Sequence, residues 1–576
     1  MKKRCGIILS LVLCCVSLSG CNILDFWSDG GGNRTQLVFY GWGNATEVAL
    51  TEQFVDDFNN SQEEIFINYT AIASNDYATK IRNALSRSQV PDVIIAGDGE
   101  IKPWIEMGGL TNLDPFIAKS DVFDLSDFWL EGQNRYYYNP TIRMNYSESL
   151  PERFKDGFHN YGIMRDLSPT VLFYNIDNME KVGINIISMT KEEIEQYNLA
   201  YSTSYEAVGY KEYDECPDPS LKKCKSLDGS KDVYRVFNNK IPLTWEWDSV
   251  NRNGYGELIE LSKILTNSYN SLSKTTYGVF YNNWFSLGWS VGANSAQWVY
   301  DDSKNLGGYY DFTIGDKTNN FKVKEGETIT VNGRTYNEGQ LVQYSDIKAV
   351  NSDASLYDKC YRLPSSLDAT QFYVDLSAKQ RISPQPDFTA STSQYALFSS
   401  GNMVSMVLDS RYSVGIWRKS IKNPGQSGGF DWDCAPAPIY KNGIPSGHSG
   451  SLAYCIPEKS THKEAAFKFI EYINGEEGQT AFAKEGYTIP NTKKLSNSSA
   501  FLTRGTRPKN SQIFIDAANY QTVGDWGFLP DKDWITIWST EFNSKVLSGQ
   551  TSLEESVTRT YARTKAKMDE YYSKIN

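Results

Sequence analysis

The sequence predicts an α/β protein built on an open, mostly parallel sheet, and three observations support this class. Strand-like and helix-like segments alternate from residue 37 to residue 108. Residues 91–96 (Pro-Asp-Val-Ile-Ile-Ala) form a short apolar run, which is typical of a strand buried on both faces. The length of 576 residues is sufficient for two or more hydrophobic cores.

The first elements can be assigned in order from the spacing of their apolar residues. Val48, Phe54, Val55 and Phe58 recur at helical spacing, and β-branched and aromatic residues fill the strand-like runs. The sequence predicts strands at residues 37–40, 65–69 and 91–96, and helices at residues 48–58, 77–85 and 101–108.

Three candidate ligand-binding residues follow predicted strands. In open parallel sheets, ligands bind beyond the carboxyl ends of the strands. Trp42 follows the first strand, and Asp98 and Glu100 follow the third. Trp42 would stack on a ligand, and the carboxylates would accept hydrogen bonds. The alternative roles are core packing for Trp42 and helix capping for the two acidic residues.

The N-terminus has the pattern of a secretory signal. Basic residues at positions 2–4 precede an apolar run from Ile7 to Val16, and small residues precede Cys21. Leu18-Ser19-Gly20-Cys21 resembles the bacterial lipobox, which implies cleavage before Cys21, lipidation of that cysteine and an extracytoplasmic, membrane-tethered protein. Residues 1–20 would be the signal peptide, and residues 21–35 the lipidated cysteine with a Gly-rich tether. The alternative is an ordinary secreted protein with a chance cysteine.

Composition excludes some partners and favours one. The formal net charge of −12 makes nucleic acid an unsuitable partner, because an acidic surface repels phosphate. It also provides no polybasic attraction to membranes, so the lipid would hold the protein there. The chain has 14 Trp, 37 Tyr and 27 Phe residues, whose flat faces and polar edges suit sugar rings. A large core with tyrosine-rich loops is the alternative explanation.

Five of the nine cysteines remain after the signal and Cys21 are set aside. Cys216 and Cys224 are close in sequence, and Cys434 and Cys455 lie in strand-like runs, so both pairs are disulfide candidates in an oxidising compartment. An odd count leaves at least one thiol unpaired. The spacing of Cys and His residues predicts no metal site.

A series of motifs, in order, resembles the extracellular solute-binding proteins of ABC importers, in the sugar-binding, maltodextrin-binding-protein-like group (family 1). The first two lie in the predicted sheet, and the others follow over most of residues 37–570. They are residues 91–96, 106–114, 161–163 with 171–175, 244–247, 276–278 with 288–289, 398–406, 461–466 and 552–555.

The resemblance implies a two-lobed, type II periplasmic-binding-protein-like fold. Each lobe would be an α/β sandwich around a mostly parallel sheet, and hinge strands would cross between the lobes. Lobe 1 would comprise residues 36–170 and 410–472, and lobe 2 residues 171–409 and 473–576. Two stretches in lobe 2, about residues 191–239 and 301–363, depart from the family pattern. The second contains Asn332-Gly333 between β-prone runs, which predicts a hairpin.

The resemblance also adds candidate ligand-binding residues to the three at the strand ends. Arg165 precedes the crossing strand, and Asp409, Arg411 and Tyr412 follow the returning hinge strand. Aromatic candidates for a ligand platform are Trp245 at an expected helix start, Trp284, Trp289 and Trp526. Core packing is the alternative for Trp245 or its neighbour Trp247.

The predicted function is capture of a carbohydrate, including an oligosaccharide, and delivery to an ABC permease, with no catalysis and no cofactor. The expected partners are the sugar, the permease subunits and the membrane through Cys21, and the protein is expected to be a monomer. A surface glycoside hydrolase, a glycan adhesin and the same fold with a non-sugar ligand are the alternatives. Paired carboxylates for hydrolysis cannot be identified from sequence alone.

Overall fold

The computed structural model describes residues 32–146, 154–281, 284–301, 303–385, 392–503, 505–529 and 532–573. The signal peptide, Cys21 and most of the tether lie outside these residues. All six elements predicted at the start of the chain are present. They are β1(Thr35–Gly41), α1(Ala45–Ser61), β2(Ile65–Ala71), α2(Ser74–Leu85), β3(Val93–Gly97) and α3(Ile101–Glu106).

These first strands form the predicted parallel arrangement. β1 lies between β2 and β3 and is parallel to both, with Phe39 opposite Tyr69 on one side and Val93 on the other. Asn44 begins α1 with a capping box: its side chain accepts from the backbone of Glu47, whose carboxylate accepts from the Asn44 backbone. The turn after β1 is therefore held in a fixed geometry.

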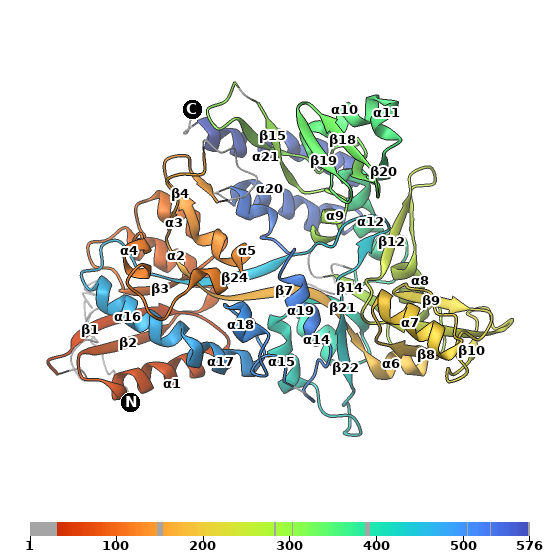
Figure 1. The fold of residues 1–576 in the computed structure, drawn as a ribbon, viewed down its shortest axis with the longest axis horizontal. Helices are drawn as coiled ribbons and strands as arrows, with labels where there is room; N and C mark the ends of the chain where they lie inside the picture. The colour runs from red at the N-terminus through yellow and green to blue at the C-terminus, as the bar shows by residue number, and fades with distance from the viewer. Residues whose placement is uncertain are drawn as a thin grey trace, which may run out of the picture.

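The strand β7(Ile163–Asn175) joins the two halves of the molecule and is buried along its whole length. Its side chains alternate between two hydrophobic cores: Val171 and Phe173 belong to the first core, and Leu172 and Tyr174 to the second. Figure 1 shows β7 and β24 running through the middle of the molecule between the two halves. The strands that pair with β7 are β21(Val404–Ser410), β22(Trp432–Ala435), β24(Ser449–Cys455) and β25(Ile489–Pro490), and β14(Tyr277–Tyr281) lies beyond β21.

The first core surrounds β1, β2 and β3. It takes in Leu37 and Phe39 together with Phe469, Phe482 and Phe514 from late in the chain. Residues 473–518 therefore pack largely in the first half, although the sequence predicted them in lobe 2. The further elements on this side and around the hinge are α4(Asp114–Ile117), η1(Leu125–Asp127), α5(Leu130–Gln133), η2(Asn134–Tyr136), β4(Tyr137–Asn139), β5(Met144–Asn145), β6(His159–Asn160), α14(Gln394–Ser399), α15(Tyr412–Ser420), α16(Lys463–Asn474), α17(Glu476–Glu485), α18(Lys493–Ser496) and α19(Gln512–Ala517).

The second core packs against the opposite side of β7. Its largest side chains include Trp245, Phe237 and Phe372. Its elements are α6(Ile176–Lys181), β8(Ile184–Ile187), β12(Thr244–Asp248), β13(Asn253–Tyr255), α8(Glu257–Ile264), α9(Ser286–Trp289), α12(Ser366–Ala378) and β23(Ile439–Tyr440). Together the two cores and the crossing β7 give the two-lobed α/β architecture that the sequence predicted.

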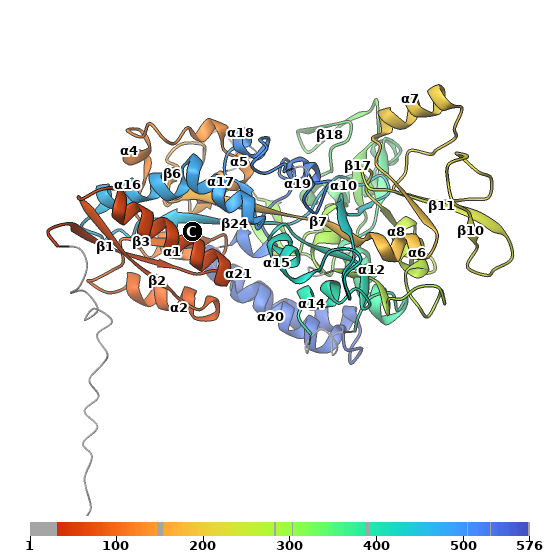
Figure 2. The same cartoon turned by 90° about the horizontal axis from the view of Figure 1, so that it is seen from below.

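Each of the two extra stretches has a small core of its own. The first extends from the end of the molecule opposite β1 and β2 (Figures 1 and 2). In the second, β18 and β19 form the predicted hairpin, with Asn332 and Gly333 at positive φ of 49° and 79°. The elements of the first stretch are α7(Lys191–Tyr201), β9(Tyr210–Tyr213), β10(Cys224–Lys225) and β11(Asp232–Asn238). Those of the second stretch are β17(Asn320–Val323), β18(Thr328–Val331), β19(Arg334–Asn337), η4(Tyr344–Asp346), α10(Ile347–Ser352), α11(Ala354–Tyr357) and β20(Cys360–Leu363).

The C-terminal segment forms a further cluster that is rich in aromatic residues. Trp534 and Trp538 pack with Phe312 and Phe542. The elements are β15(Ala296–Tyr300), β16(Gly308–Phe312), η5(Asp525–Phe528), α20(Asp533–Glu541), η6(Phe542–Val546) and α21(Leu553–Ser573). Ile142 and Met144, beside β5 of the first half, also pack against this cluster, which therefore contacts both halves.

The structure corrects the disulfide predictions. Cys216, Cys224, Cys360, Cys434 and Cys455 are free thiols. Cys434 lies opposite Phe173 of β7, whereas Cys455 follows Tyr454, which lies opposite Ile163. Ten residues of extended strand separate these partner positions, about 33 Å at the usual rise, so Cys434 and Cys455 cannot form a disulfide bond. The two short sequences around Cys434 and Cys455 do not show that their strands pair with opposite ends of β7.

Candidate functional site

A buried polar cluster begins where β3 ends. Asp98 follows β3, and its side chain is 8% exposed. Arg135 donates from Nη1 to Asp98 Oδ2 at 3.1 Å and from its guanidinium to the backbone and hydroxyl oxygens of Ser449, both at 2.6 Å. Burial raises the pKa of Asp98, and Arg135 offsets this only in part. The other carboxylate oxygen, Oδ1, is buried and has no partner among the described residues.

Hydrogen bonds continue from this point to the hinge strand. Tyr136, next to Arg135, donates to Ser451 Oγ at 2.9 Å, and Ser451 donates to the backbone oxygen of Asp166 at 2.7 Å. The backbone N–H of Leu452 donates to the Asp166 carboxylate at 3.2 Å. β24 is thereby fastened to β7 by side chains as well as by the strand ladder.

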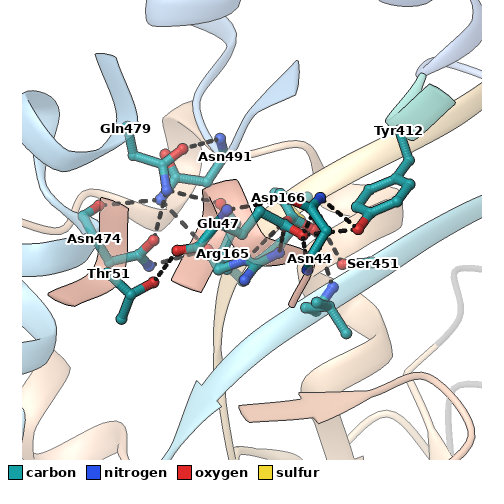
Figure 3. A network of polar contacts seen from close by, with 12 residues as sticks. Asn44, Glu47, Thr51, Arg165, Asp166, Tyr412, Ser451, Asn474, Gln479 and Asn491 are labelled. Atoms are coloured by element: carbon teal, nitrogen blue, oxygen red, sulfur yellow. Dashed lines mark hydrogen bonds and ion pairs between the residues drawn. The ribbon is translucent and has the colours of Figure 1, made fainter. Parts of the chain in front are cut away.

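The network then reaches α1 and α15, as Figure 3 shows. Arg165 donates to Asp166 at 2.6 Å and lies 3.4 Å from the Glu47 carboxylate. Tyr412 donates to Glu47 Oε2 at 2.8 Å, and Asn44 donates to the Tyr412 hydroxyl at 2.7 Å. Burial alone would lower the pKa of Arg165, but Asp166 and Glu47 raise it above its usual value. We call the residues from Asp98 through Arg135, Tyr136, Ser451, Asp166, Arg165 and Glu47 to Tyr412 the polar floor.

An aromatic cluster lies beside the Asp98 end of the polar floor. His448, next to Ser449, has its ring 5.8 Å from Phe285 and 5.5 Å from Trp526. Phe285 lies 5.0 Å from Trp526 and 5.3 Å from Trp289. Burial, together with the nearby Arg135, lowers the pKa of His448 to about 3, so the imidazole is neutral at ordinary pH. Its Nδ1 atom is buried and has no partner among the described residues. We call Phe285, Trp289, His448 and Trp526 the aromatic wall.

Asp525 fixes the orientation of the aromatic wall. It accepts from Trp289 Nε1 at 3.0 Å and from the Ser295 backbone at 2.6 Å. Burial raises the pKa of Asp525 to about 6. The 3-10 helix η5, which carries Trp526, is therefore attached to α9 and to the segment that precedes β15.

Two lysines connect the first half of the molecule with the segment around η5 and α20. Lys532 Nζ lies 2.6 Å from Glu100 Oε1, and the buried Lys102 donates to the backbone oxygen of Gly527. The Lys532 side chain crosses directly over Gly99, where a Cβ atom would overlap the Lys532 Cε atom. A larger residue at this position would therefore displace the end of the Lys532 side chain.

The structure brings several predicted residues together at this junction. Asp98, Arg165 and Tyr412 belong to the polar floor, Trp289 and Trp526 to the aromatic wall, and Glu100 to the ion pair beside them. Trp284 packs 5.5 Å from Phe285 and 5.2 Å from Phe542, at the edge of the C-terminal cluster.

Four other predicted residues lie elsewhere. Trp42 is partly buried, 6.3 Å from Tyr77. Asp409 is buried near the hinge and accepts from Gln394 at 3.2 Å, and burial raises its pKa to about 7. Arg411 is 0% exposed. Trp245 is also 0% exposed and packs against Phe372 in the second core, because residues 244–248 form strand β12 rather than the expected helix start.

Sequence reasoning did not select Arg135, Phe285, His448 or Lys532. Arg135 lies in the short helix η2 and meets Asp98 only through the fold, 37 positions apart in sequence. Lys532 and Glu100 are 432 positions apart. No local pattern could have identified these residues.

The described part of the chain offers no group of three or more metal-binding side chains. None of its helices has the length and apolar character needed to cross a membrane.

Comparisons with known proteins agree with this architecture. A family model described as bacterial extracellular solute-binding protein matches residues 250–507, and a second model with the same description matches residues 42–198. No protein with a curated description matches the sequence.

Solved structures show the same fold at low sequence identity. An ABC substrate-binding protein from Listeria monocytogenes in complex with cycloalternan is 15% identical, with a TM-score of 0.58 over 93% of this chain and 100% of that chain. The maltose-bound MalE3 of T. maritima is 15% identical, with a TM-score of 0.56 over 92% and 99%. UgpB from Mycobacterium tuberculosis in complex with glycerophosphocholine is 15% identical, with a TM-score of 0.56 over 92% and 98%.

Proposed function

Because the chain belongs to the bacterial extracellular solute-binding proteins, we propose that it captures a carbohydrate between its two halves and delivers it to an ABC permease. The observation that carries the proposal is the unpaired, buried Asp98 Oδ1 on the polar floor, near an aromatic wall that contains Trp526. A charged acceptor beside aromatic side chains suits a ligand with hydroxyl edges and C–H faces. His448 Nδ1 is a second unpaired acceptor or donor at the same place.

The charge balance of the polar floor favours a neutral polyhydroxy ligand. Arg135 is paired with Asp98, and Arg165 lies between Asp166 and Glu47. Phosphate recognition relies on cations that are free to bond with the phosphate oxygens. Two of the similar structures contain cycloalternan and maltose, which also supports a sugar, including an oligosaccharide.

The proposal extends to location and to the absence of catalysis. Cleavage before Cys21 and lipidation of that residue would hold the protein on the outer face of the membrane, close to its permease. Each carboxylate of the floor has at least one oxygen bonded to a cation, a backbone N–H or a hydroxyl, which supports a binding role rather than hydrolysis. The protein would act as a monomer without a cofactor.

The test is a thermal-shift screen against monosaccharides, oligosaccharides and glycerophosphocholine. A ligand at 100 times its dissociation constant stabilises the folded protein by about 2.7 kcal/mol, which is easily detected. We expect a sugar to raise the unfolding midpoint, and Asp98→Asn and Trp526→Ala to reduce that rise. Trp538→Phe, in the C-terminal cluster, is the control. A shift with glycerophosphocholine and with no sugar would refute the carbohydrate assignment.

Lipidation has its own test. The chain with Cys21 should fractionate with membranes in a bacterial host, and the Cys21→Ser variant should be released. Membrane association that is unchanged by Cys21→Ser would exclude the lipid anchor.

A further inference from the structure

Arg411 is a buried cation without a bonded partner. It lies between β21 and α15, where its backbone N–H donates to the oxygen of Pro169 at 2.8 Å. Its side chain is 0% exposed, and none of its three guanidinium nitrogens has a hydrogen-bond partner among the described residues. Phe501 and Phe514 lie near the guanidinium, with ring centroids 4.6 and 4.8 Å from its central carbon.

The surroundings do not compensate this charge. A guanidinium stays protonated in proteins, and an isolated buried charge is far more costly than aromatic contacts can offset. The charged group that acts on it most strongly is Arg418, which is also positive. Burial raises the pKa of the neighbouring Cys434 thiol well above its usual value, so that thiol is neutral. Asp409 bonds instead to the Ser410 backbone at 2.7 Å and to Gln394.

A second buried polar side chain without a partner lies on the neighbouring strand. Thr170 of β7 is opposite Ser410, the residue before Arg411, and is 1% exposed. Its hydroxyl also lacks a partner among the described residues. Thr170 has the parity of Leu172 and Tyr174, whose side chains face the second core. Arg411 instead packs against Phe514, which contacts Phe173 on the other face of β7. The two unpaired groups therefore lie on opposite faces of the strand, and Thr170 is not a hydroxyl partner for Arg411.

We propose that Arg411 binds a small inorganic anion of the halide class at this hinge. The N–H groups of a guanidinium radiate in its plane, and contacts with aromatic rings supply no acceptor for them, so an anion in that plane would complete the bonds. A monovalent anion matches the single positive charge, and complete burial favours a small ion over an organic acid. The bound anion would brace the contact between β21 and β7, independently of the sugar proposed for the polar floor.

The test measures unfolding of the full chain in sodium chloride and in sodium gluconate at constant total ionic strength. Gluconate is too large to enter a buried site, so a difference reports specific binding. We expect the wild-type midpoint to rise by about 1–3 °C as chloride replaces gluconate up to about 200 mM. We expect Arg411→Met to abolish this rise, because an apolar side chain of similar length needs no counterion.

Arg507→Met is the matched control. The Arg507 guanidinium also contacts an aromatic ring, 5.7 Å from Trp432, but it donates to the backbone oxygens of Phe430 and Ile421 at 2.8 and 3.1 Å. This variant should keep the chloride response. Crystals of the wild type grown in bromide should give an anomalous peak at Arg411, a readout that needs no variant. A wild-type midpoint indifferent to chloride, an equal response in Arg411→Met or no bromide peak would each overturn the proposal.

Discussion

The Glu100–Lys532 ion pair provides the sharpest test of how the two halves are held together. The pair joins the end of β3 to the start of α20, with 2.6 Å between Nζ and Oε1. The side chains are 43% exposed for Lys532 and 27% for Glu100, so solvent screens the pair and we assign it only about 0.5–1 kcal/mol. If closure of the two halves makes the pair, losing it lowers the closed population, and ligand affinity falls about two- to fivefold.

Three variants should give the same result by different routes. Glu100→Gln and Lys532→Gln each remove one charge, and Gly99→Ala displaces the Lys532 side chain while keeping both charges. In a double-mutant cycle the second substitution should add little to the first, with a coupling energy of about 0.5–1 kcal/mol. The assays are calorimetric titration of the strongest ligand and thermal unfolding of the free protein.

The matched control is the Lys468–Glu64 pair, 3.0 Å apart within the first half, with side chains 61% and 74% exposed. Lys468→Gln should leave ligand affinity unchanged. Strictly additive effects of Glu100→Gln and Lys532→Gln, or a Gly99→Ala variant with wild-type affinity, would show that closure does not depend on this ion pair.

Three further predictions concern stability and reactivity. Burial raises the folded-state pKa of Asp409 from 3.8 to about 7. The contribution of its protonated form to the free energy of unfolding is therefore full below about pH 4 and is lost as pH rises through 7. From about pH 4 to about pH 8, the thermal unfolding midpoint of Asp409→Asn should fall less than that of the wild type. Asp346, 0% exposed, accepts from Arg334, Tyr336 and Asn332, so Asp346→Ala should destabilise the second extra stretch by about 3–5 kcal/mol, seen as rapid proteolysis there with unchanged ligand affinity. Among the five described cysteines, the exposed Cys216 should react with a thiol reagent in the folded protein, whereas the buried Cys434 and Cys455 should react only after unfolding.

The local architecture could be predicted from the sequence because its signals are local. Apolar spacing identified β1 through α3 within a few residues, and Asn332-Gly333 identified the β18–β19 hairpin. The path of the chain late in the sequence could not be read in the same way. α17 packs in the first half because β25 pairs with β7, a choice made by long-range pairing rather than by any local pattern.

Some residues of the candidate site could be predicted from local sequence patterns and others could not. Asp98 was identified because strand ends have a general relation to ligands, whereas its partner Arg135 comes from a short helix with no distinctive pattern. Trp245 was misjudged because a tryptophan next to acidic residues looks similar at a helix start and in a strand. In β12 the side chains alternate, and that of Trp245 faces the core.

The division between the polar floor and the aromatic wall indicates how selectivity and closure could be separated in this molecule. From Asp98 to Tyr412 the floor is tied to β3, β7, β24, α1 and α15, and buried hydrogen bonds hold nearly every member, so it presents a fixed pattern of acceptors. Phe285, Trp289 and Trp526 of the wall lie at α9 and η5, whereas His448 lies immediately before β24. The segment around η5 meets the first half through Lys102 and Lys532 and through backbone bonds of Thr522 to Gly447 and Ser449. Separation of Phe285, Trp289 and Trp526 from the floor would break the Lys102 and Lys532 contacts and leave the floor network intact. Substitutions in the floor should therefore change which ligand binds, and substitutions at Gly99, Glu100 or Lys532 should change how tightly every ligand binds.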